Sequence, residues 1–213
     1  MDKKQLITHI KEFIKLEDFK ALDKGADAVS LVRENEIFKD EIIFTYKKSQ
    51  GGYILSHKLN GRKSFFAINL ILKKYFDKIG KHYQEHTLSF QSRSFDHIFN
   101  EIFFEAEDLV KIENDYKTMV HDDLIPFFNR YKTLEDVNTY MLEFTSEEVT
   151  RLVSSPIKIM VLKRLINASD WVEYSEKTIE TYRVNSKRRN KAIFAPVSSI
   201  LPDLYDELQS LNI

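Results

Sequence analysis

The residue pattern with the sharpest chemical meaning is His82-Tyr83-Gln84-Glu85-His86, which matches H-x-x-E-H. On a helix, two imidazoles four residues apart share one face and can bind zinc, while the glutamate acts as a base toward zinc-bound water. The metal-ligand candidates are therefore His82 and His86, and the nearest downstream carboxylates are Glu101 and Glu105. A surface helix terminus is the ordinary interpretation of the same string, because it runs into an extended-looking segment. On that interpretation we expect no bound cofactor.

A second candidate is a dense run of cations near the C-terminal end of the chain. It contains Arg183, Lys187, Arg188, Arg189 and Lys191, and no acidic residue interrupts residues 183–199. Arg62 and Lys63 form another basic locus, with Tyr46, Tyr53 and Phe65 nearby in the sequence. Cations can follow phosphates and aromatic rings can stack on bases, so these residues predict a nucleic-acid-binding surface. The alternative is a solvated charge run.

Further carboxylates have both a chemical and a structural interpretation. Glu101, Glu105 and Asp108 would share one helix face, where they could bind a divalent cation or form the solvated side of the helix. Asp122 and Asp123 are expected to cap the helix that contains the Pro126 position, because carboxylates favour a helix N-terminus.

The composition excludes several classes of protein. The 213 residues contain 32 Lys and Arg against 33 Asp and Glu, so no global charge attracts nucleic acid or acidic membranes. No P-loop, Rossmann or nucleophile-elbow motif is present, and glycine is scarce. Cysteine is absent, which excludes disulfides and Cys-ligated zinc. Without a signal-like or bilayer-length apolar run, we expect a soluble, cytoplasmic protein with no membrane partner.

The elements that would position these residues follow from hydrophobic periodicity. Residues 4–20 predict an amphipathic helix. Residues 28–71 predict an antiparallel meander with a turn at residues 49–52 and a hairpin turn at Asn60-Gly61. A helix over 73–81 and a strand over 87–91 follow. From Phe95 onward the spacing predicts helices, one of them capped by Thr133 and one begun by Ser155-Pro156.

The expected fold class is α+β. It has an N-terminal helix, an antiparallel meander of three to four strands and a predominantly helical C-terminal half. Residues 1–105 form the helix-plus-meander part and 106–213 the helical part, which we expect to pack as one continuous domain, since no Pro/Gly/Ser linker separates them.

The segment 122–131, Asp-Asp-Leu-Ile-Pro-Phe-Phe-Asn-Arg-Tyr, followed by Thr133-Leu134-Glu135-Asp136, resembles small uncharacterised bacterial proteins of the toxin-immunity type. The resemblance covers residues 1–145 and carries no catalytic residue. It implies a non-catalytic module that binds another protein, as an immunity or regulatory partner. The alternatives are nucleic-acid binding through the 183–191 run and, as a minor one, zinc-dependent hydrolysis at the H-x-x-E-H string.

Overall fold

The computed structural model describes residues 2–25, 27–80, 84–105, 107–143, 149, 152–153, 155–187 and 194–212. Its internal contacts divide the chain into two compact units, each built from two separate stretches of sequence. Unit 1 comprises Met1–Lys63 and Ser89–Lys132, and unit 2 comprises Ser64–Leu88 and Thr133–Ile213. The boundary expected between residues 105 and 106 separates a strand-containing part from a helical part, and it stays a prediction.

Unit 1 begins with helix α1 (Lys3–Ile14), which a reciprocal capping box starts. The Asp2 carboxylate accepts from the backbone N–H of Gln5, and the Gln5 side chain accepts from the backbone N–H of Asp2, both at 2.8 Å. The helix is shorter than the 4–20 predicted, because Lys15 takes a left-handed conformation (φ 41°) that ends it. The residues after it enter the sheet instead.

The described strands form a seven-stranded sheet. They are β1 (Lys20–Asp23), β2 (Ala28–Glu34), β3 (Phe38–Ser49), β4 (Gly52–Leu55), β5 (Asn60–Phe65), β6 (Leu88–Gln91) and β7 (Ile102–Phe103). Their order is β1-β2-β3-β4-β7, and β5 pairs with β3 and β6. The β1–β2, β2–β3, β3–β4 and β4–β7 pairs are antiparallel.

The predicted hairpin turn at Asn60-Gly61 is wrong, because both residues belong to strand β5. Gly61 is there for space: a Cβ atom on it would lie 2.9 Å from Leu124 Cδ2 and 3.3 Å from the Phe128 ring. The glycine therefore lets the strand approach the helical layer closely. The turn predicted before Gly52 does form, with positive φ at Gln50 and Gly51.

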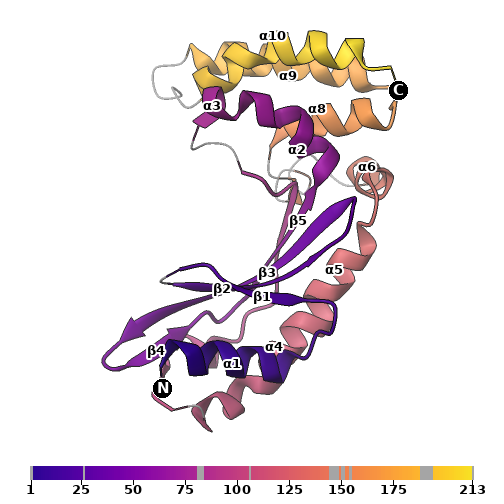
Figure 1. Cartoon of the computed structure of the whole chain (residues 1–213). Helices are drawn as coiled ribbons and strands as arrows, with labels where there is room; N and C mark the ends of the chain where they lie inside the picture. Colours follow the sequence, from indigo (N-terminus) through magenta and orange to yellow (C-terminus); the bar gives the residue numbers. More distant parts are fainter. Residues whose placement is uncertain are drawn as a thin grey trace. The chain divides into compact units, whose positions relative to one another are not determined.

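The helical segments of unit 1 lie on one side of this sheet (Figure 1). After the short turn η3 (Asp96–Ile98), they run as η4 (Glu107–Ile112), α4 (Glu113–Thr118), the π-helical turn η5 (Met119–Leu124) and α5 (Ile125–Arg130). The helix predicted to begin at Phe95 does not form in the described residues. The turn η3 and the short strand β7 (Ile102–Phe103) occupy this segment. Asp122 and Asp123 lie inside η5 and do not cap a new helix.

Unit 2 is mostly helical. Its elements are α2 (Phe66–Leu72), η1 (Lys73–Tyr75), α3 (Phe76–Ile79), α6 (Leu134–Glu143), α8 (Pro156–Leu165), α9 (Trp171–Ser186) and α10 (Phe194–Ser210). The cap predicted at Thr133 forms, since its Oγ1 accepts from the Asp136 N–H at 3.1 Å. Arg164 of α8 donates to the backbone carbonyls of Leu208, at 2.7 Å, and Leu211, near the end of α10.

The predicted fold class is confirmed: an N-terminal helix, an antiparallel sheet of several strands and a mostly helical C-terminal half. None of the helices in the described part of the chain combines the length and apolar character needed to cross a bilayer.

Candidate functional site

The sheet of unit 1 has one face packed against helices. Phe44 lies 5.8 Å from the Tyr116 ring of α4, and Phe90 stacks on Phe127 of α5 at 5.1 Å. Side chains alternate along a strand, so Asp40 and Ile42 share this face with Phe44. The residues between them point to the opposite side, which we call the open face because no helix of unit 1 covers it in Figure 1.

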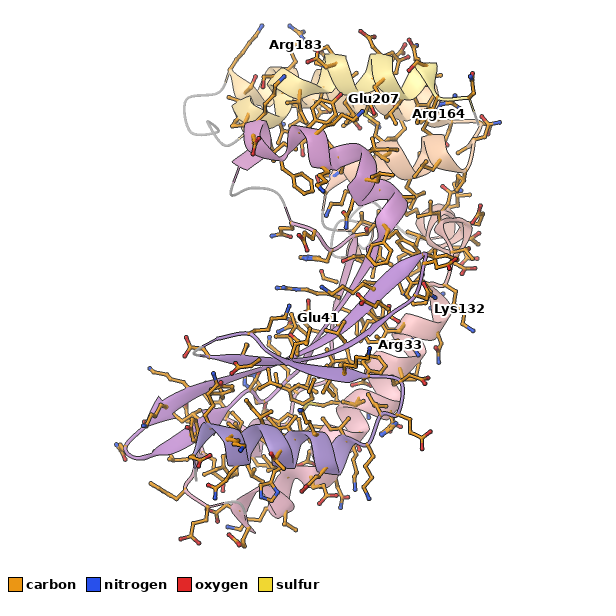
Figure 2. All side chains as sticks on the ribbon, viewed as in Figure 1. Arg33, Glu41, Lys132, Arg164, Arg183 and Glu207 are labelled. Atoms are coloured by element: carbon orange, nitrogen blue, oxygen red, sulfur yellow. The ribbon has the colours of Figure 1, made fainter. Side chains whose placement is uncertain are left out.

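The strand register places two rows of side chains across the open face. Lys20 lies opposite Val32, and Val32 lies opposite Glu41. In the next row Leu22 lies opposite Ser30, and Ser30 lies opposite Ile43. Arg62 of β5 joins this face because its neighbours Gly61 and Lys63 face the helices. Figure 2 labels Glu41 and Arg33, which belong to opposite faces of the sheet.

Cations outnumber carboxylates on the open face. Glu41 forms an ion pair with Lys24 at 3.0 Å, which neutralises it. Burial would raise the pKa of Glu41, but the hydrogen bond from Lys24 and the nearby Lys39 hold it below its usual value. Lys20 and Arg62 are exposed and have no ion-pair partner among the described side chains. The second carboxylate is that of Glu34, opposite Lys39 in the register.

The apolar residues of the open face differ in exposure. Leu22, on the edge strand β1, is 45% exposed, whereas Val32 on β2 and Ile43 on β3 are buried. Polar side chains lie on the β5–β6 side of the open face. There Lys58 donates to Gln91 at 3.1 Å, and Gln91 donates to Asn60 at 3.2 Å. The face therefore combines an exposed apolar side chain with polar and basic side chains, and protein interfaces use both kinds of contact.

The covered face holds a buried ion cluster that removes Lys63 from the surface. Its Nζ lies 2.5 Å from Asp40 Oδ1 and 3.4 Å from the Phe38 ring centroid, and its side chain is 0% exposed. Arg33 donates to the other Asp40 oxygen at 2.7 Å. Burial raises the pKa of Asp40 against the opposing pull of Lys63 and Arg33. Lys63, predicted to contact nucleic acid, is therefore not available to a phosphate.

The aromatic residues predicted to stack on bases are also inaccessible. Tyr46, Tyr53 and Phe65 are all buried, and the rings of Tyr46 and Tyr53 pack edge-on to each other at 5.7 Å. Of the predicted residues in this region, Arg62 alone is exposed on the described surface.

Residues 84–86 of the predicted zinc motif lie in the described structure. His82 falls outside the described residues, so the convergence of His82 and His86 stays a prediction. The His86 backbone carbonyl accepts from Lys158 Nζ at 2.5 Å, and Lys158 donates to the Gln84 carbonyl as well. Burial lowers the pKa of Lys158 to about 7, although Glu85 opposes the shift. The Lys158 amine thus fixes the backbone of this segment.

The downstream carboxylates do not form the predicted helix face. Glu101 lies just before β7, and Glu105 lies in a turn. Asp108 accepts from the backbone N–H groups of Phe104 and Glu105 at 3.2 Å and pairs with Lys111. These contacts and the positive charge of Lys111 lower the pKa of Asp108. Asp108 therefore stabilises a turn.

The basic run is described in part. Arg183 lies on α9 and pairs with Glu180 at 2.6 Å, and Lys187 is the residue after that helix. Arg188, Arg189 and Lys191 lie outside the described residues. Nucleic-acid contact by this run stays a prediction.

A hollow of about 380 Å³ lies between α1 and the η4–α4 segment of unit 1. Leu109 and Val110 line it together with charged side chains from both segments. Lys117 and Glu113 pair with each other, and the His9 ring lies 3.9 Å from Glu12.

No group of three His, Asp or Glu side chains within the described ranges is arranged to hold a metal ion. Comparison with protein-family models, with curated proteins and with solved structures found no match to this chain.

Lys20, Leu22 and Lys39 belong to no sequence motif, and the strand register places them together on the open face. The alternation of Lys20 and Leu22 is typical of a strand, but the periodicity of residues 4–20 predicts a helix that includes Lys20. The antiparallel pairing of β1 with β2 is a feature of the folded sheet that the local sequence does not reveal.

Proposed function

We propose that the protein is a non-catalytic module that binds another protein through the open face of unit 1. The observation that carries this is a sheet face that no helix of unit 1 covers, where the exposed Leu22 on the edge strand β1 shares the face with the exposed cations Lys20 and Arg62. Protein interfaces combine apolar contacts with polar and charged ones, and this face offers both. An immunity or regulatory role, as the resemblance of residues 122–136 implies, is one such binding function.

The buried chemistry of unit 1 agrees with a binding role. Asp40 and Lys63 are the strongest candidates for acid–base chemistry by their burial, but neither reaches solvent. A catalytic group must lie within hydrogen-bond reach of its substrate. The cluster instead ties β5 to β3, and this holds the open face in shape.

Affinity capture with the Leu22→Ser variant tests the proposal. We expect a bound protein that is retained by the wild-type chain and lost with Leu22→Ser. The matched control is Leu70→Ser, which removes a leucine that is 74% exposed on α2 of unit 2. A capture profile that Leu22→Ser leaves unchanged, or recovery of nucleic acid in place of protein, would overturn the proposal.

A further inference from the structure

We infer that the partner presents an acidic protein surface to the open face; this rests on the proposed function and specifies the partner's chemistry. The chain as a whole is close to neutral, with 32 cationic and 33 anionic residues. The open face departs from that balance, because Lys20, Lys39 and Arg62 add to the paired Lys24 while Glu34 and Glu41 are its carboxylates. The excess is local and sits on one side of the sheet.

The geometry favours a partner that makes both ionic and apolar contacts. Lys20 and Leu22 are two residues apart on β1 and point the same way, so a cation and an apolar side chain stand side by side. Arg62 lies on the same face of the sheet, on strand β5, which pairs with β3. A carboxylate-rich surface that also carries an apolar side chain would pair with the cations and cover Leu22.

A single-stranded nucleic acid fits this face less well. Sheet surfaces that bind single strands stack bases on exposed aromatic side chains. The two described rows across β1, β2 and β3 contain no aromatic residue. Phe44 and Phe90, on these strands and on β6, pack against the helices on the covered face. Phosphates would find cations here but no ring for the bases.

The test compares two labelled polyanions by fluorescence anisotropy at low salt. One probe is a poly-L-glutamate peptide, and the other is a single-stranded oligonucleotide of equal charge. We expect the peptide to bind the intact chain more tightly than the oligonucleotide. Reversing Lys20 and Arg62 together, as Lys20→Glu/Arg62→Glu, is expected to weaken peptide binding by at least about tenfold, and added salt to weaken it in the wild type.

The matched control is Lys4→Glu/Lys11→Glu, which makes the same change of charge on exposed residues of α1. Peptide binding lost equally in both double variants would mean that net charge, and not the open face, binds the probe. Tighter binding of the oligonucleotide would replace the acidic protein with nucleic acid. Either result, or no peptide binding, overturns the inference. Leu22-dependent protein capture would still stand on its own, so the two failures are distinguishable.

Discussion

Substituting Lys63 by methionine should destabilise unit 1 strongly, because it leaves a buried carboxylate without its closest cation. Asp40 and Lys63 are both 0% exposed, and their charged atoms are 2.5 Å apart. Removing one partner of a buried pair typically costs about 3–5 kcal/mol. The ammonium also lies 3.4 Å from the Phe38 ring, a cation–π contact worth about 1–2 kcal/mol when desolvated. Arg33 still bonds Asp40, so we expect a net loss of about 4 kcal/mol.

The loss should depend on pH in a direction set by Asp40. Burial already raises the pKa of this carboxyl, and removal of Lys63 would raise it further. An acid whose pKa is higher in the folded state costs stability as pH rises through that pKa, because the folded protein must give up a proton it holds more tightly. The defect of Lys63→Met is therefore expected to be larger above the raised pKa of Asp40 than below it.

The matched control is Arg62→Met, the neighbouring residue on β5 with its side chain on the open face. It should change stability by less than about 0.5 kcal/mol. The double variant Asp40→Leu/Lys63→Met should recover most of the loss, since a buried ion pair can be replaced by apolar groups at little cost.

Hydrogen exchange of peptides from β3 and β5 is the suitable assay, because the single tryptophan, Trp171, belongs to unit 2. If the free energies of opening for Lys63→Met match those for Arg62→Met, the Asp40–Lys63 pair does not stabilise unit 1 and the reasoning is refuted. A defect that shrinks as pH rises would refute the role given to Asp40.

Four further changes test other parts of the structure. The pKa of Lys158 falls to about 7 in the folded protein, so at mildly alkaline pH the unfolded chain binds a proton that the folded chain lacks. The free energy of unfolding should therefore rise by about 2 kcal/mol between pH 7 and pH 9. Lys158→Met should remove that rise in urea unfolding followed by tryptophan fluorescence, and an unchanged slope would contradict the assignment. Arg164→Met should cost about 2 kcal/mol in the same assay, through lost bonds to the carbonyls near the end of α10; no loss would mean that water replaces them. Asp2→Ala should cost about 1 kcal/mol and increase exchange in α1, whereas unchanged exchange would argue against the capping box. Gly61→Ala should cost about 1–3 kcal/mol, measured as faster exchange in β5, and a neutral result would show that the Leu124 side chain can move aside.

The sequence predicted elements well where local periodicity and turn chemistry decide them. The strand around Ile42 to Tyr46, the turn before Gly52 and the cap at Thr133 all form. It failed at Asn60-Gly61, because the same dipeptide that favours a turn also permits close packing against Leu124. That distinction depends on a helix more than sixty residues further along the chain.

The candidate site shows the same limit in terms of charge. Arg62 and Lys63 are adjacent cations, and the sequence gives no reason to separate them. In the strand they point to opposite faces, so one is exposed and the other is completely buried against Asp40. The buried member becomes part of what holds β5 to β3, and the exposed member becomes part of the open face. Because adjacent strand residues point to opposite faces, only one of these two cations can lie against the helices of unit 1. Which one it is depends on where the strand finds a buried carboxylate.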